Sequence, residues 1–192
     1  MRDQSNRTTD TDVVTVLRRE HDRIRVLLSS VTAGGTRDRS EERWESFSAL
    51  SDLLVRHEVA EELVVYPALS GRRGGDAVSR SRLADQAAIE AFLVNLDRGR
   101  FASPDFERDL VGLGLRVLAH LDKEEAQVLP LLATVVSTHR RAELGRSYLD
   151  AVSLACAPPG VGGVPSGPAV VDRTTAVATF MRDSVGMSEL AG

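Results

Sequence analysis

Two segments of the chain share one layout, in which a histidine is followed four residues later by a glutamate, five later by a second glutamate and ten later by a proline. They are LVRHEVAEELVVYPAL, residues 54–69, and VLAHLDKEEAQVLPLL, residues 117–132. The two align without a gap, which indicates an internal repeat. On a helix, residues four apart lie one turn above each other on the same face. The resulting neighbours are His57 with Glu61 and His120 with Glu124.

Both pairs fall within apolar stripes of the kind that helices turn toward the core of a bundle. The stripes contain Phe47, Leu50, Leu54 and Val64 around the first pair, and Leu110, Leu113, Val117 and Val128 around the second. A carboxylate is costly to bury unless it is paired or binds a metal. Two His–Glu pairs facing one core therefore predict a metal site. A third histidine, His21, lies in another apolar row and is a further candidate.

The remaining pattern predicts an all-α protein, because no alternation of period two indicates a strand. Helices are predicted from Asp10 or Asp12, which can cap the first one, to Val31, from Ser40 to Pro67, over Ser79–Asp97, and from Phe106 to Thr138. Short connections with glycine or proline separate them. We expect an up-down-up-down four-helix bundle, followed by a fifth helix before Cys156 and a C-terminal helical extension.

Composition sets the domain organisation and excludes several classes of protein. The 192 residues, 42% of them hydrophobic, suffice for one domain with a core. We expect a disordered N-terminus over 1–9, the bundle over 10–155, a Pro/Gly-rich linker over 156–168 and a helical tail over 169–192. The net charge of −4 gives no basic footprint for nucleic acid. No apolar run is long enough for a membrane span, so we expect a soluble cytoplasmic protein, either a monomer or a homodimer.

The order of these motifs resembles the hemerythrin-like HHE cation-binding family. The resemblance covers about residues 11–138 and rests on His21 in LRREHDRI, His57 and Glu61 in RHEVAEELVVYP, and His120 and Glu124 in AHLDKEEAQVLP. It implies two iron ions, bridged by the two carboxylates and by an oxo or hydroxo group, with imidazoles completing the ligand shells. A mixed set of histidine and carboxylate ligands suits iron and its neighbours.

The third helix departs from the family pattern, in which it supplies a histidine. The matching position holds Gln86, and Glu90 follows one turn later. Both are candidates for an additional ligand, although a solvent-exposed Glu90 is the alternative. Without that imidazole, one iron would keep an open or water-filled position, which favours exchangeable ligands and peroxide or oxygen chemistry. The other consequence would be partial metal occupancy.

The resemblance implies a protein that binds or reacts with O2, NO or peroxide, in oxygen or iron handling or in oxidative-stress defence. The sequence leaves open whether it is an enzyme, for example with catalase-like activity. The alternative is a regulatory or interaction bundle with a degenerate metal site, which would contact a partner through the last helix, Val170 to Val185. In that alternative the His–Glu pairs are hydrogen-bonded core pairs and His21 is a core histidine.

Three other residues of the motifs are expected to lie outside the ligand set. Glu62 and Glu125 lie well round the helix from the first glutamates, so they are expected to be solvated or to support ligands from outside. Tyr66 lies nine residues after His57, on nearly the opposite face of an α-helix. We expect it to pack; a role as a tyrosinate ligand would require Pro67 to distort the helical turn.

Overall fold

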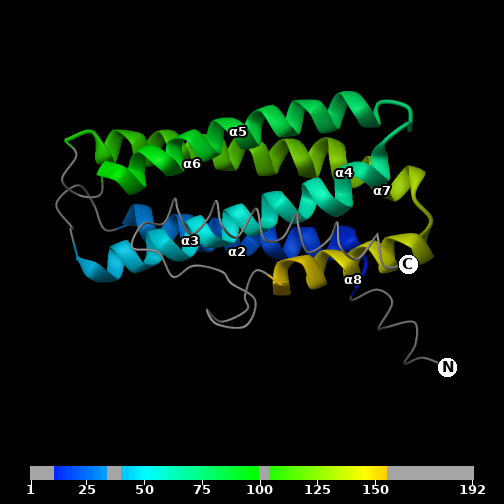
Figure 1. Cartoon of the computed structure of the whole chain (residues 1–192), viewed down its shortest axis with the longest axis horizontal. Helices are drawn as coiled ribbons and strands as arrows, with labels where there is room; N and C mark the ends of the chain where they lie inside the picture. The colour runs from blue at the N-terminus through cyan, green and yellow to red at the C-terminus, as the bar shows by residue number, and fades with distance from the viewer. Residues whose placement is uncertain (1–10, 34–39, 100–103, 155–192) are drawn as a thin grey trace.

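The computed structural model describes residues 11–33, 40–99 and 104–154, and almost all of them are helical (Figure 1). No strand occurs within these three ranges. The N-terminus at 1–9, the linker at 156–168 and the tail at 169–192 lie outside the described residues, so their assignments stay predictions. Within the described ranges, no helix is both long enough and apolar enough to cross a membrane.

Four long helices, two of them extended by short segments, make up the bundle. They are α2 (Val13–Ala33), α3 (Glu41–Ala60), α5 (Gly75–Gly99) and α6 (Phe106–Lys123). A π-helical turn (Glu61–Val65) and α4 (Tyr66–Leu69) continue α3. A second π-helical turn (Glu124–Val128) and α7 (Leu129–Val135) continue α6 in the same way. After a short break, α8 (Thr138–Leu154) folds back along the bundle.

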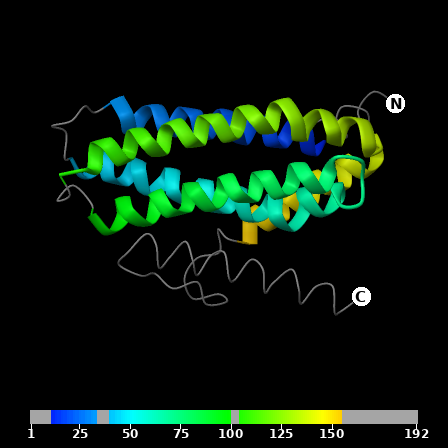
Figure 2. The same ribbon diagram turned by 90° about the horizontal axis from the view of Figure 1, so that it is seen from above.

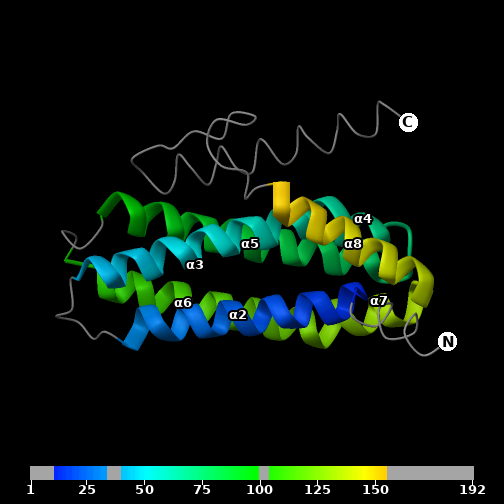
Figure 3. The ribbon, with the colours of Figure 1, turned by 90° about the horizontal axis from the view of Figure 1, so that it is seen from below.

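Consecutive long helices run in opposite directions and lie along a common axis (Figure 2). α2 packs mainly on α3, and α5 mainly on α6. α8 covers α2 and α3 near the end of the bundle where α7 lies (Figure 3). The predicted fold class, an all-α up-down-up-down four-helix bundle with a helix beyond it, is confirmed.

Several helix boundaries differ from the predictions. The fourth helix was expected to reach about Thr138, but α7 ends at Val135 and Thr138 begins α8. α5 begins at Gly75, about one turn before the predicted Ser79. Pro67 does not end the second helix, because it lies in the first turn of α4, which continues to Leu69. Pro67 has no N–H for the helical ladder, and the π turn that ends just before Tyr66 lets the helix continue past it.

Polar side chains fix the ends of the helices. The Asp12 carboxylate accepts a hydrogen bond from the Val14 backbone N–H at 3.0 Å, which caps α2. The Arg141 Nε of α8 donates to the other oxygen of Asp12 at 2.8 Å, so the same residue also anchors α8. The two elements approach so closely there that a Cβ on Gly145 would collide with the Thr11 carbonyl. This glycine is therefore required for the packing of α8.

The opposite end is fixed by Arg43, which is only 4% exposed. Its two terminal nitrogens donate to the two carboxylate oxygens of Glu107 at 2.7 and 2.9 Å, and its Nε donates to the Val31 carbonyl at 2.9 Å. This paired geometry is the strongest form of an arginine–carboxylate contact. One buried arginine thus joins the end of α2 and the starts of α3 and α6.

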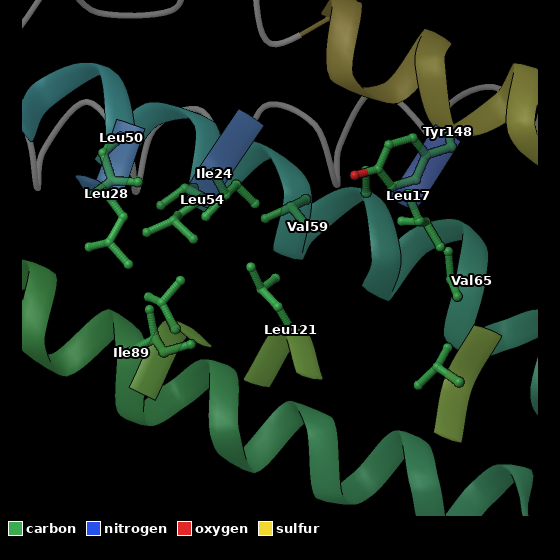
Figure 4. Packing of buried hydrophobic residues seen from close by; sticks show 14 of the residues in the cluster. Leu17, Ile24, Leu28, Leu50, Leu54, Val59, Val65, Ile89, Leu121 and Tyr148 are labelled. Carbon is green, nitrogen blue, oxygen red and sulfur yellow. The ribbon is translucent and has the colours of Figure 1, made fainter. Parts of the chain in front are cut away.

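Apolar side chains from every long helix fill the space between them (Figure 4). Leu17 and Ile24 of α2, Leu54 of α3, Ile89 of α5 and Leu121 of α6 are all 1% exposed or less. Of the stripe residues expected around the two motifs, all face the core except Val64, which is half-buried. The π turn brings Val65, at 0% exposure, to the core instead. The histidines and first glutamates of the two motifs lie in these stripes, so they are buried in the interior.

The core position of Leu54 gives a test of this packing. We expect Leu54→Ala to lower the free energy of unfolding by about 2–5 kcal/mol, because it leaves a cavity at a side chain that is 1% exposed. Leu115→Ala, at a side chain that is 66% exposed, should change it by less than about 0.5 kcal/mol. Urea unfolding followed by circular dichroism measures both, and equal losses in the two variants would contradict this assignment of the core.

Candidate metal centre

Each of the two repeated motifs contains a π-helical turn that begins at its first glutamate. The Tyr66 backbone N–H bonds to the Glu61 carbonyl, and the Leu129 N–H bonds to the Glu124 carbonyl, five residues back in both cases. A proline follows directly in both motifs and has no N–H to continue the ladder. Turns of this kind are rare and often lie at functional sites.

The extra residue in the π turn changes which side chains face the core. Tyr66, expected to point away from His57, instead turns its hydroxyl toward the two glutamates. It lies 3.1 Å from Glu61 Oε2 and 2.9 Å from Glu124 Oε1, and only 5% of the residue is exposed. The prediction that Tyr66 only packs was therefore wrong, because it assumed an uninterrupted α-helix.

Four of the predicted site residues converge in the middle of the bundle. His21, His57, Glu61 and Glu124 each offer one nitrogen or oxygen, and these four atoms lie within 4.8 Å of one another. All four residues are 0% exposed. They come from α2, from α3 and from the first residues of the two π turns, so the cluster depends on three separate segments of the chain.

His120, the fifth predicted residue, lies on the other side of Glu124. Its Nε2 is 3.5 Å from Glu124 Oε1, while Glu124 Oε2 is 3.4 Å from His21 Nε2 and 3.8 Å from His57 Nε2. The carboxylate of Glu124 thus lies between the three imidazoles, with one oxygen directed to each side.

The three imidazoles are oriented alike, with Nε2 toward the cluster and Nδ1 toward an oxygen outside it. The Nδ1 contacts are His21 to Glu125 at 2.9 Å, His57 to the Tyr148 hydroxyl at 2.7 Å, and His120 to Asp85 at 3.9 Å. The hydrogen-bonded oxygen partners of His21 and His57 orient these rings and fix the tautomer that leaves Nε2 free for a metal. The His120 contact is too long for a hydrogen bond, and its Nδ1 has no hydrogen-bond partner in the described part of the chain. Glu125 thus bonds to the candidate ligand His21 on the side away from the cluster. This matches one of the two roles expected for it from the sequence.

The two candidates on the third helix differ sharply. Gln86 is 3% exposed and its Nε2 donates to Glu61 Oε2 at 3.0 Å and to the Tyr66 hydroxyl at 2.8 Å. Glu90 is exposed on the outer face of α5. Its candidacy as a ligand is therefore corrected. Four residues advance the helix by about 40° more than one full turn, and Ile89, at 0% exposure, takes the core position while Glu90 faces solvent.

The two carboxyl groups at the centre have opposite protonation preferences. Burial and then the charge of Glu124 raise the pKa of Glu61 well above 4.5. Burial also acts to raise the pKa of Glu124, but its contacts with His21 and His57 outweigh burial and hold that pKa well below 4.5. In the metal-free protein Glu124 is thus the ionised member of the pair, and Glu61 is the one that keeps a proton.

The imidazoles of His57 and His120 and the phenol of Tyr66 favour their neutral forms. Burial lowers the pKa of His57 below 6.5 and that of His120 to about 4. Burial and the nearby carboxylates raise the pKa of Tyr66 well above 10. A neutral phenol has one proton, so the Tyr66 hydroxyl can donate to only one carboxyl group at a time. Its other contact can be made by the proton on Glu61, which donates to the phenol oxygen. Neutral imidazoles are the form that binds metals.

The donor atoms of this centre fit a divalent transition metal. Five of them are buried without a hydrogen-bond partner in the described part of the chain: Nε2 of His21, His57 and His120, Oε1 of Glu61 and Oε2 of Glu124. Unpartnered buried polar atoms are costly and rare in folded proteins. A cation bound by imidazole nitrogens and carboxylate oxygens would satisfy all of them, and this ligand set suits iron and its neighbours.

Comparison with known proteins agrees with this geometry. The family described as hemerythrin HHE cation binding domain matches residues 12–132. The crystal structure of a hemerythrin HHE cation binding domain-containing protein from Mycobacterium kansasii superposes with a TM-score of 0.59 at 20% sequence identity, covering 84% of this chain and 97% of that chain. No curated protein matches the chain.

The chain belongs to the hemerythrin HHE cation-binding domain family. The matched residues include all five of the predicted His and Glu ligands and both π turns. They do not include α8, which supplies Tyr148. Family membership indicates a metal-binding site, and the cluster lies where such a site is expected.

Tyr148 has no signal in the sequence that connects it with His57, because it lies on a helix beyond the matched residues. It is 0% exposed, and burial raises its pKa well above 10, so the phenol stays neutral beside His57 Nδ1. Tyr148→Phe keeps the ring and removes only the hydroxyl. We expect it to lower the affinity for Fe²⁺ about 10–100-fold, which is the usual effect of losing such an outer partner.

Competition with a chelator under anaerobic conditions measures this affinity. Ser51→Ala is a suitable control, because it removes a buried hydroxyl of α3 that bonds only to the Phe47 carbonyl at 2.9 Å. Equal affinities for Tyr148→Phe and wild type would show that Tyr148 does not support His57.

Glu58 offers a test of the electrostatic cost of the site. It is 6% exposed, and burial followed by the charge of Glu124 raises its pKa well above 4.5. Above pH 4.5 the unfolded chain releases this proton while the folded chain keeps it, so the carboxyl group costs stability as the pH rises. From about pH 5 to about pH 8, metal-free Glu58→Gln should therefore become progressively more stable than metal-free wild type.

The free energy of unfolding in urea, measured at several pH values, tests this expectation. The buried histidines contribute equally to both proteins, so they cancel in the difference. Glu62→Gln, at a half-buried neighbour, is the control. If the difference in free energy of unfolding between Glu58→Gln and wild type does not change with pH, the raised pKa of Glu58 is contradicted.

Proposed function

We propose that this protein is a non-haem di-iron protein of hemerythrin type, with His21, His57, Glu61, His120 and Glu124 as the metal ligands. The observation that supports this most strongly is the convergence of five unpartnered donor atoms in a fully buried site. When bound, the two irons would supply reversible binding of O2 or NO, or a redox reaction with peroxide.

The contacts of the two motifs argue against simple hydrogen-bonded core pairs. His57 Nε2 is 3.7 Å from Glu61, and His120 Nε2 is 3.5 Å from Glu124. These separations are longer than ordinary N–H···O hydrogen bonds. They leave space for an ion between the partners, which favours a metal centre over a degenerate site.

The protein contributes two functions to such a centre. The apolar core keeps bulk water away, which strengthens electrostatic contacts inside the site. Tyr66 holds a proton within hydrogen-bond distance of both carboxylates. It is thus placed to donate that proton to an oxygen or nitrogen ligand that acquires negative charge at the centre.

A surface pocket marks one route by which a small molecule could approach. It has a volume of about 500 Å³, lies between α4 and α5, and shares Tyr66 with the centre. Its other lining residues are Glu62, Pro67, Ser70, Asp76, Ser79, Arg80 and Leu83. Tyr66 lines this pocket and also contacts both glutamates, so its side chain lies between a ligand in the pocket and the centre.

The first test is the metal content of freshly purified protein together with its near-ultraviolet and visible spectrum. We expect about two irons per chain with oxo-to-iron absorption bands, and the loss of both in Glu61→Ala/Glu124→Ala, because these carboxylates face both sides of the centre. Glu62→Ala/Glu90→Ala removes two glutamates outside the cluster and should keep the iron. A wild-type protein without metal would support the alternative of a helical interaction bundle.

Addition of hydrogen peroxide or O2 to the iron-loaded protein then separates a carrier from an enzyme. A reversible spectral change without turnover indicates a carrier, whereas evolution of oxygen from peroxide indicates catalase-like activity. If neither response is observed, metal binding alone remains as the function, and both the carrier and the enzyme forms of the proposal are excluded.

A further inference from the structure

The two sides of the candidate centre differ in the donors that they offer. We call the space between His21, His57 and Glu124 Oε2 the first position, and the space between His120, Glu124 Oε1 and Tyr66 the second position. The first has two imidazoles and the second has one. Gln86 stands where the family pattern has a histidine, and its Nε2 bonds to the Tyr66 hydroxyl that borders the second position and to Glu61 Oε2.

The three donor atoms that define the first position, His21 Nε2, His57 Nε2 and Glu124 Oε2, make no hydrogen bonds within the described residues. Glu61 also borders it, since Glu61 Oε2 lies 3.7 Å from His57 Nε2. That oxygen is bonded to Tyr66 and Gln86, but Glu61 Oε1 has no hydrogen-bond partner in the described part of the chain. A metal that binds the three defining atoms breaks no hydrogen bond of the protein and satisfies three buried atoms at once. Its binding therefore relieves a cost that the metal-free protein carries.

The second position is already filled by a hydrogen-bond network. The Tyr66 hydroxyl lies 2.9 Å from Glu124 Oε1, and the Gln86 amide donates to Tyr66 at 2.8 Å and to Glu61 Oε2 at 3.0 Å. Two candidate oxygens near the second position, Glu124 Oε1 and Glu61 Oε2, are thus engaged. A metal entering there has to break these contacts, which offsets part of its binding free energy.

Gln86 is the residue on which this network depends. Its amide nitrogen, which cannot bind a metal, points at Glu61 and Tyr66, while its Oε1 is buried without a partner in the described part of the chain. To act as a ligand, the amide would have to turn over and lose both hydrogen bonds. Even then it would offer a neutral carbonyl oxygen, which suits iron less well than an imidazole.

We propose that the two positions bind metal with unequal affinity and that Gln86 sets the difference. The first ion binds tightly between His21, His57 and Glu124, and the second binds more weakly beside His120. This inference rests on the proposed metal-binding function and goes beyond it. It implies that a one-metal form exists over a wide range of metal concentration and that the second ion is exchangeable.

The test is a titration of the full-length metal-free protein with Fe²⁺ under anaerobic conditions, followed by calorimetry and by metal analysis after gel filtration. We expect two steps whose dissociation constants differ by at least about tenfold, the size of effect that one lost ligand or outer partner produces. Gln86→His should reduce the ratio of the two dissociation constants, which we call the gap, by about tenfold, because it supplies an imidazole and removes the amide that bonds to Glu61 and Tyr66.

Three further variants separate the role of Gln86 from general effects. Glu90→His adds a histidine one turn away on the exposed face of α5 and should leave both steps unchanged. His120→Gln should abolish the second step and keep the first within about threefold. Gln86→Glu, which has almost the same shape, should also narrow the gap, and it replaces Gln86→His if circular dichroism shows that the larger side chain disrupts the fold.

The outcomes that overturn the inference are distinct from failure of the proposed function. Two equal steps in wild type, an unchanged gap in both Gln86 variants, or equal weakening of both steps in His120→Gln would overturn the inequality while metal binding stands. The absence of any Fe²⁺ binding by wild type would overturn the proposed function, and this inference with it.

Discussion

The cost of burying two carboxyl groups beside three imidazoles is the constraint on which the rest of this structure depends. Glu61 and Glu124 lie in the centre of a hydrophobic core at 0% exposure. Such groups are tolerated only when they are neutralised, hydrogen-bonded or bound to a metal. Two of these means act in part of the site: Glu61 keeps a proton, and the hydroxyl of Tyr66 lies within hydrogen-bond distance of both carboxyl groups. The donor atoms left over are those that a metal would satisfy.

A second layer of contacts holds the histidines in place, and two of its members are themselves held by cations. Glu125, at His21, accepts from Arg25 Nη1 at 2.8 Å. Asp85, on the Nδ1 side of His120, lies 3.0 Å from Arg82 Nη1 and 3.1 Å from Lys123 Nζ. His57 instead faces the neutral phenol of Tyr148. Glu125 and Asp85 are partly exposed, whereas Tyr148 is buried. The charged partners are therefore those that water can solvate, and the buried partner is neutral.

Much of the centre could be predicted from the sequence, because its ligands recur with a fixed spacing on apolar helical faces. All five predicted His and Glu residues lie in or beside the cluster. Tyr66 was missed since periodicity assumes a uniform helix, and a π turn shifts every following residue to a new face. A proline in the same place after both motifs was the available signal. Tyr148 could not be found in this way, because tertiary packing of α8, and no local pattern, brings it to His57.

Gln86 and Glu90 show how far spacing alone can discriminate. Both follow the pattern of one helix, one turn apart, yet the first is 3% exposed and the second faces solvent. The rotation of a helix relative to its neighbours decides between them. The rotation of α5 about its own axis is set by side-chain packing along its whole length. The spacing of two residues carries no information about that rotation.

The two π turns also bear on the origin of the centre. A π turn is an α-helix with one residue inserted, and here the insertion lies at the same place in both motifs, between the metal-facing glutamate and the proline. If the motifs arose by copying a single ancestral helix, the insertion was already present before the copy was made. The ancestral helix would then have carried its glutamate, its distorted turn and its proline together, and pairing two such helices would have placed two carboxylates face to face from the start.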